Sequence, residues 1–151
     1  ALKVKRGAFV TLKNRGQLAG CIGFIQPIEP LYRTVIENTK NASSKDWRFE
    51  PVRAGDLAHI EIEISALTVP EEVDSVDKFE VGRHGIIIEK ARRSAVFLPQ
   101  VAPEQGWDRE TTLKHLCRKA MMPDDEWRKP GMKFSVFEAE VFHEEKPGGG
   151  R

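Results

Sequence analysis

The sequence predicts an α+β domain, in which a few helices pack on a mostly antiparallel, mixed sheet. The clearest strand signal is Ile60-Glu61-Ile62-Glu63-Ile64-Ser65, where apolar and polar residues alternate with the period of two that a strand with one wet face has. Helical spacing of apolar residues follows Pro30 and Asp108, and both residue types commonly begin helices. Strands and helices of this kind together indicate the α+β class.

A β-hairpin is expected near the start of the chain. Ala8–Leu12 and Leu18–Ile25 are rich in strand-forming residues, and Asn14-Arg15-Gly16 between them is a turn signal. The prolines that follow end the second strand, because proline has no N–H to donate to a sheet. Cys21 therefore lies midway along the second strand.

A helix is expected to follow Pro30 and to run to about Ala42. Its apolar face is formed by residues at helical spacing, namely Leu31, Val35 and Thr39, with Tyr32 and Ile36 beside them.

The second half of the chain predicts two paired strands, a helix and a last strand. Ile86–Ile88 is an apolar strand, and Ala95–Leu98 returns beside it. Asp108 is suited to cap a helix. The core-facing positions of that helix are Leu113, Leu116, Cys117 and Ala120. Met132–Phe142 is expected to form one continuous strand.

The totals fit one soluble globular domain. The chain has 151 residues, of which 40% are hydrophobic and 31% are charged. We take residues 1–145 as the domain and residues 146–151 as a disordered end. The net charge of +1 does not by itself favour nucleic acid or a membrane surface. No apolar run approaches the ~18 residues that a membrane span needs.

Two cysteines, Cys21 and Cys117, lie far apart in the sequence. They form neither a C-x-x-C motif nor a paired framework, which favours a reducing, cytoplasmic setting. No signal peptide is expected before Ala1. A metal site would need three or four ligands at recognisable spacing, so none is predicted.

Cys21 is the leading candidate for chemistry, because glycines flank it in an otherwise apolar strand. Gly20 and Gly23 each cost about 0.5–1 kcal/mol inside an element, which indicates that a strand, a helix or a ligand approaches the backbone closely. A thiol acts as a nucleophile only as thiolate, and His84 is the best candidate base. The alternative is a buried, inert thiol, since cysteine is among the most buried residue types.

Other candidates lie in loops that follow strands. Arg83, beside His84, could hold an anion, while Gln100 and Glu104 could supply a hydrogen bond and a carboxylate. Asp46-Trp47-Arg48-Phe49 could form a binding lip, or a loop pinned by its aromatic side chains. The basic start of the chain could contact RNA, or could be a solvated edge; its cations are Lys3, Lys5, Arg6, Lys13 and Arg15.

These residues occur in an order that resembles the AMMECR domain family, whose prokaryotic members are called AmmeMemoRadiSam system protein A. The resemblance runs from Gly7 to Phe142. It is carried by six stretches in order: Gly7–Leu12, Leu18–Gly23, Asp46 with Arg48-Phe49, Val81–Gly85, Leu98–Glu104 and Gly106-Trp107.

The resemblance implies a fold with a larger and a smaller subdomain and a groove between them. It also implies that the hexapeptide Leu18–Gly23, with Gly20, Cys21 and Gly23, belongs to a functional site. Its genomic association implies a Memo-type protein and a radical-SAM protein as partners, and it assigns no cofactor and no reaction.

Two departures from the family pattern concern the site. Ala19 stands where the family usually has arginine, so a bidentate anion donor is absent. The helical segment with which members usually begin is absent before Ala1, so one wall of the groove could be incomplete.

Three functions remain open at this point. The leading hypothesis is an interaction or ligand-binding module, with Gly20, Gly23, Arg48 and Arg83 as contact residues. The alternative is a cysteine-dependent enzyme component that uses Cys21, His84, Gln100 and Glu104. RNA contact is third, and it predicts steeply salt-dependent binding.

Overall fold

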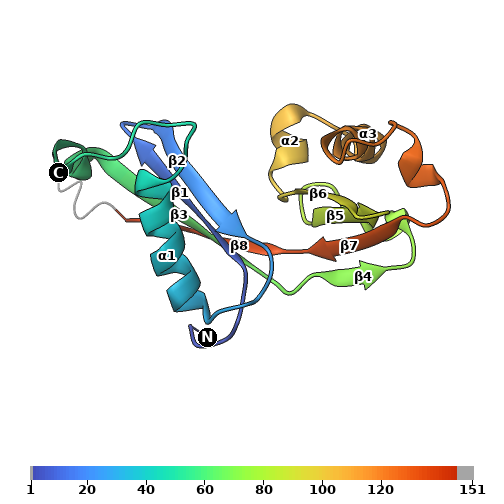
Figure 1. Ribbon diagram of the computed structural model, residues 1–151, viewed down its shortest axis with the longest axis horizontal. Helices are drawn as coiled ribbons and strands as arrows, with labels where there is room; N and C mark the ends of the chain where they lie inside the picture. Colours follow the sequence, from blue (N-terminus) through green and yellow to red (C-terminus); the bar gives the residue numbers. More distant parts are fainter. Residues whose placement is uncertain (1, 146–151) are drawn as a thin grey trace. The chain divides into compact units, whose positions relative to one another are not determined.

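The computed structural model describes residues 2–145, which form two compact units (Figure 1). The first unit contains the residues up to Val69 and those from Glu140 on, and the second contains Pro70–Ala139. Each unit has its own four-stranded sheet. Antiparallel pairing with a few helices confirms the α+β class. The expected disordered end, residues 146–151, lies outside the described residues.

The sheet of the first unit has the strand order β2-β1-β3-β8. Its strands are β1 (Ala8–Asn14), β2 (Gln17–Phe24), β3 (Ile60–Leu67) and β8 (Ala139–His143). The predicted hairpin is confirmed: β1 and β2 pair through a two-residue turn in which Arg15 and Gly16 both have left-handed φ angles, of 52° and 81°. This order makes β2 an edge strand.

Helix α1 (Leu31–Ser44) lies on one face of this sheet (Figure 1). The helix itself is as expected, and Leu31 and Val35 pack on the core as predicted. Thr34 and Asn38 are buried as well, whereas Tyr32 and Ile36 are 39% and 49% exposed, so the buried face is rotated in part from the predicted one. The side-chain amide of Asn38 donates to the carbonyl oxygen of Ala8 at 3.1 Å, so this polar residue is hydrogen-bonded where it is buried over β1.

The second unit has the strand order β4-β7-β5-β6. Its strands are β4 (Glu71–Val73), β5 (Gly85–Lys90), β6 (Arg93–Phe97) and β7 (Lys133–Phe137), and its helices are α2 (Val101–Gln105) and α3 (Arg109–Lys119). Helix α3 buries Leu113, Leu116 and Cys117 against Ile86 and Ile88 of β5. The predicted core face of this helix is therefore confirmed, and Cys117 is a core residue.

Short 3-10 turns complete the described elements: Ala54–His59, Val76–Lys78 and Glu126–Arg128. None of the helices within residues 2–145 combines the length and apolar character needed to cross a bilayer.

The prediction of one strand over Met132–Phe142 is wrong. The segment contains β7 and β8, which belong to different sheets and are separated by Glu138. Two successive residues, Val136 and Phe137, are both buried, which an uninterrupted strand with one wet face does not allow. The chain leaves one sheet after Phe137 and enters the other at Ala139.

Candidate functional site

Cys21 lies on the edge strand β2, directly opposite Thr11 of β1. Its sulfur atom is 3.3 Å from the hydroxyl oxygen of Thr11. Because side chains alternate along a strand, Cys21 points to the face of the sheet opposite that of Gly20 and Ile22, and thus away from α1. The Cys21 thiol is only partly buried, whereas Cys117 has no exposed surface and burial raises the pKa of its thiol.

The free backbone groups of Cys21 are bound by Asp46 and Arg48. The backbone N–H of Cys21 donates to Asp46 Oδ2 at 3.0 Å, and Arg48 Nη2 donates to the carbonyl oxygen of Cys21 at 3.1 Å. The two side chains also bind each other, through Arg48 Nε to Asp46 Oδ1 at 2.9 Å and Nη2 to Oδ2 at 2.7 Å. We call this pair the Asp46–Arg48 clamp. It provides the backbone N–H and C=O of Cys21 with the hydrogen bonds that a neighbouring strand would otherwise make.

Both side chains of the clamp, the Asp46 carboxylate and the Arg48 guanidinium, are charged. The hydrogen bond from Arg48 holds the pKa of the Asp46 carboxyl well below its ordinary value, helped by the N–H of Cys21 and opposed by burial. The same bond raises the pKa of Arg48. The Asp46 side chain is 2% exposed, so it is a buried carboxylate that is charged and paired.

The structure explains the two glycines by packing. A Cβ at Gly20 would overlap the carbonyl oxygen of Ala42, at the end of α1, and a Cβ at Gly23 would overlap β1 at Ala8 and Phe9. The close approach expected from the sequence is therefore made by a helix and a strand. A role of Gly20 and Gly23 in ligand contact stays a prediction.

The loop that carries the clamp also presents Trp47, whose side chain is 91% exposed. Phe49, by contrast, is partly buried, and the Arg48 guanidinium lies 5.3 Å from the centre of its ring. The two aromatic side chains therefore differ: Phe49 pins the loop, while Trp47 projects from it.

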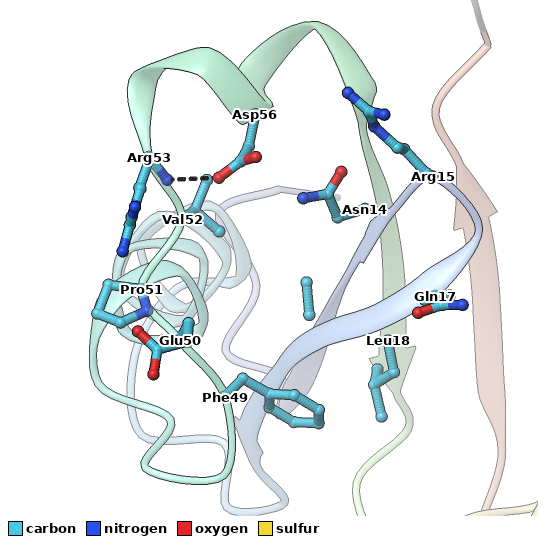
Figure 2. Close-up of a pocket in the computed structure, with 11 residues that line it drawn as sticks. Asn14, Arg15, Gln17, Leu18, Phe49, Glu50, Pro51, Val52, Arg53 and Asp56 are labelled. Atoms are coloured by element: carbon cyan, nitrogen blue, oxygen red, sulfur yellow. Dashed lines mark hydrogen bonds between the residues drawn. The ribbon is translucent and has the colours of Figure 1, made fainter.

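A cavity of about 590 Å³ adjoins this loop (Figure 2). Phe49 and Leu18 lie at one end in Figure 2, and Asn14, Arg15 and Asp56 lie at the other. Ala19 also lines the cavity, and it is the extra residue of a β-bulge, because Leu12 pairs with Gly20 and Lys13 with Leu18. No sequence signal pointed to this cavity, since its walls come from segments that meet only in the folded chain.

Arg83 and His84, in the second unit, lie among carboxylates. Arg83 donates to Glu138 Oε1 at 2.5 Å and to Glu80 Oε2 at 2.8 Å. The Nδ1 atom of His84 accepts the backbone N–H of Glu80 at 3.1 Å, and its Nε2 atom lies 3.9 Å from Glu138 Oε1. With Nδ1 acting as an acceptor, the neutral ring carries its proton on Nε2, which can then donate a proton but not accept one.

Gln100 is the residue that caps the start of α2, and Glu104 lies within that short helix, in the same unit as His84. A Cβ on Gly82 would lie 3.5 Å from Pro103 Cγ, so the Val81–Gly85 loop and α2 are in contact. Gln100 is partly buried and Glu104 is exposed. Cys21 belongs to the other unit, so a site shared by Cys21 and His84 stays a prediction.

Parts of the basic start serve the fold. Arg6 donates to the carbonyl oxygens of Leu67 at 2.7 Å and Ala66 at 3.1 Å, and Lys13 lies 3.9 Å from Glu63 Oε2. Within residues 2–145, no group of three or more His, Cys, Asp or Glu side chains is arranged to hold a metal ion.

Comparison with known proteins places the chain in a family. The AMMECR1 family model matches residues 1–142. Protein MK0488 of Methanopyrus kandleri is 47% identical over 157 residues, which cover 98% of this chain and 76% of that protein. Protein MJ0810 of Methanocaldococcus jannaschii is 42% identical over 153 residues, covering 96% of this chain and 76% of that protein.

A solved structure shares the fold. The crystal structure of the uncharacterized protein PH0010 from Pyrococcus horikoshii matches with a TM-score of 0.86 at 40% identity, and the match covers 97% of this chain and 77% of that one. The family model and these relatives agree with the resemblance seen in the sequence, and the chain belongs to the AMMECR1 family.

Proposed function

We propose that this domain is an interaction module whose contact site is the loop Lys45–Glu50. One observation carries the proposal: Trp47 is 91% exposed on a loop whose neighbouring residues are hydrogen-bonded to β2. The residues on either side of Trp47 form the Asp46–Arg48 clamp on β2. Tryptophan is among the residue types that most often dominate binding free energy at an interface.

Rigidity of the loop favours binding. A partner that buries Trp47 does not have to order the loop first, because the hydrogen bonds of Asp46 already hold it. Tryptophan and arginine are also the residue types most enriched among the side chains that dominate binding free energy. Arg48, beside Trp47, has 47% of its side chain exposed.

A small ligand could use the same loop. The cavity in Figure 2 shares Phe49 with it, and its volume of about 590 Å³ lies within the range of small-molecule sites. The family likeness suggests a Memo-type protein and a radical-SAM protein as the partners, and we propose these two as the first to be tested.

The test compares Trp47→Ala with Leu57→Ala. Leu57 is an exposed apolar residue of the same unit, at 66% exposure, so it controls for the general loss of surface hydrophobicity. Binding of the whole chain to the purified Memo-type and radical-SAM proteins of the same organism is measured by calorimetry. We expect Trp47→Ala to weaken binding by about thirtyfold or more, the effect of a central anchor, and Leu57→Ala to leave it unchanged.

Equal affinities of the two variants for a bound partner would refute the role of Trp47. A failure of both proteins to bind the unaltered chain would refute these partners. Circular dichroism of each variant checks that the fold is intact.

A second candidate function is that of a cysteine-dependent enzyme component, and one observation favours it. The Cys21 thiol is partly exposed, with the Thr11 hydroxyl 3.3 Å from its sulfur atom, whereas Cys117 is enclosed in the core. The Nδ1 atom of His84 already accepts the backbone N–H of Glu80, which leaves it less available as a base, so the binding module is favoured.

The thiol reaction with iodoacetamide separates these functions. An activated Cys21 would be alkylated faster at pH 7 than a free cysteine in a small peptide, while Cys117 would react only on unfolding. A rate for Cys21 at or below the peptide value would refute the enzyme candidate. Mass spectrometry of digested protein assigns the modified residue.

A further inference from the structure

The outer face of α1 is apolar at its centre although it faces solvent. Tyr32 and Ile36, one helical turn apart, are 39% and 49% exposed and form a ridge. The buried residues of the same helix are Leu31, Thr34, Asn38 and Ala42, and Val35 joins them to the ridge at the edge of the core. The apolar stripe of α1 is therefore wider than the face that the sheet covers.

A groove lies on each side of this ridge. One, of about 640 Å³, lies between the ridge and Phe24 of β2, and the other, of about 420 Å³, lies between the ridge and the residues Leu2, Ile64 and Phe142. Both are lined by Tyr32 and Ile36 themselves. A ridge beside a groove of similar length is the shape that two helices need for packing ridges into grooves.

The charges on the outer face alternate in sign, in the order Arg33, Glu37 and Lys40, and Glu29 precedes them in the bend before the helix. All four side chains are more than half exposed. Arg33 lies 4.0 Å from Glu29, and Lys40 lies 3.5 Å from Glu37. Pairs as exposed as these contribute little to stability and can be exchanged at low cost.

When a second copy of α1 lies antiparallel to the first, positive charges on one helix lie opposite negative charges on the other. If a second α1 lies antiparallel and the two-fold axis passes near Val35, Arg33 faces the partner's Glu37. Tyr32 and the partner's Ile36 then lie within about two residues of the same level along the helix pair. A parallel arrangement would instead place like charges together.

We propose that the outer face of α1 binds a second copy of this chain, related by a two-fold axis, to form an antiparallel helix pair. The shape and the charge pattern support the same arrangement independently: the ridge fits the groove of its own copy, and the charges complement themselves. Such self-complementarity is what a two-fold interface requires. Leu2 and Phe142, 64% and 53% exposed at the rim of one groove, extend the apolar contact.

The first test is analytical ultracentrifugation of the whole chain from low micromolar to near-millimolar concentration. We expect a reversible monomer–dimer equilibrium, and loss of the dimer in the Ile36→Ser variant, which removes the centre of the ridge. A chain that stays monomeric throughout would overturn the proposal and would leave the face to another segment or another protein.

The second test uses charge reversal, because it separates the proposed contact from any other dimer. Arg33→Glu and Glu37→Arg each place like charges opposite one another twice across the axis, so each should weaken the dimer by about tenfold or more. An equimolar mixture of the two variants brings opposite charges together at both places. We expect the mixture to recover the dimer, as a heterodimer.

Two controls complete the design. Glu71→Arg reverses an exposed charge in the second unit and should leave the dimer unchanged. Thermal melts by circular dichroism show whether each variant keeps its fold. The proposal would be overturned if either single charge reversal left the dissociation constant of the dimer unchanged. It would also be overturned if the mixture of the two variants dimerised no more strongly than each variant alone.

Discussion

The carboxylate of Asp46 lies 3.0 Å from the backbone nitrogen of Cys21, where the carbonyl oxygen of a neighbouring strand would otherwise be. A loop side chain thus completes the hydrogen bonding of an edge strand. Arg48 supplies the matching donor to the Cys21 carbonyl oxygen. This one pair thereby ties the loop that carries Trp47 to the strand that carries Cys21.

Asp46→Ala should destabilise the protein by about 1–3 kcal/mol, since it leaves the N–H of Cys21 and the half-exposed guanidinium of Arg48 without their buried acceptor. Urea unfolding measures the free energy. Asp74→Ala is the control, because the Asp74–Lys78 pair is exposed, and it should leave the free energy of unfolding nearly unchanged. Similar losses in the two variants would contradict the structural role of Asp46.

The same carboxylate makes stability depend on pH at the acid end. The pKa of Asp46 is depressed in the folded state, so its contribution is fully present above the ordinary value of 3.8 and is lost as the pH falls through the depressed pKa. We expect the free energy of unfolding to decline below pH 4, and to decline less steeply in Asp46→Asn. Identical slopes for the two proteins between pH 4 and pH 2 would show that Asp46 is not the titrating group.

Gly20→Ala should destabilise the protein by about 2 kcal/mol or more, because the added methyl group meets the main-chain carbonyl oxygen of Ala42 and not a movable side chain. Gly55→Ala is the matched control, since a Cβ there meets no atom within 4 Å. That substitution should be neutral or stabilising by up to about 1 kcal/mol. Melting temperatures compare the two, and a harmless Gly20→Ala would mean that α1 does not approach β2 as described.

Arg15→Asn should stabilise the β1–β2 hairpin by about 0.5–1 kcal/mol. Arg15 has a φ of 52°, a conformation that asparagine tolerates better, and Asn-Gly is a favoured pair for this turn. Gly16→Ala, at a φ of 81°, should act in the opposite direction. Equilibrium unfolding in urea measures both, and a destabilising Arg15→Asn would contradict the turn geometry.

The elements with local signals could be predicted from the sequence. The hairpin was marked by Arg15-Gly16 between two strand-like stretches, and β3 by the alternation of Ile60 to Ser65. The burial of Asn38 on α1 could not be predicted, because its hydrogen-bond partner is the carbonyl of Ala8, thirty positions earlier. Hydrophobic periodicity carries no information about such a bond.

The boundary at Glu138 was missed for a related reason. Residues on both sides favour strands, and nothing local shows that β7 and β8 belong to different sheets. Cys21 and Arg48 were singled out separately in the sequence, but their contact could not be predicted, because it spans 27 positions and needs the loop to fold back on β2. The cavity beside Ala19 had no signal in the sequence.

The Asp46–Arg48 clamp also bears on self-association through strands. An uncovered edge strand is a template on which further chains can add and build fibrils. Since the amide and carbonyl of Cys21 are already occupied, β2 cannot accept an intruding strand in register across its middle. The loop that carries Trp47 thereby also blocks strand addition at the middle of β2.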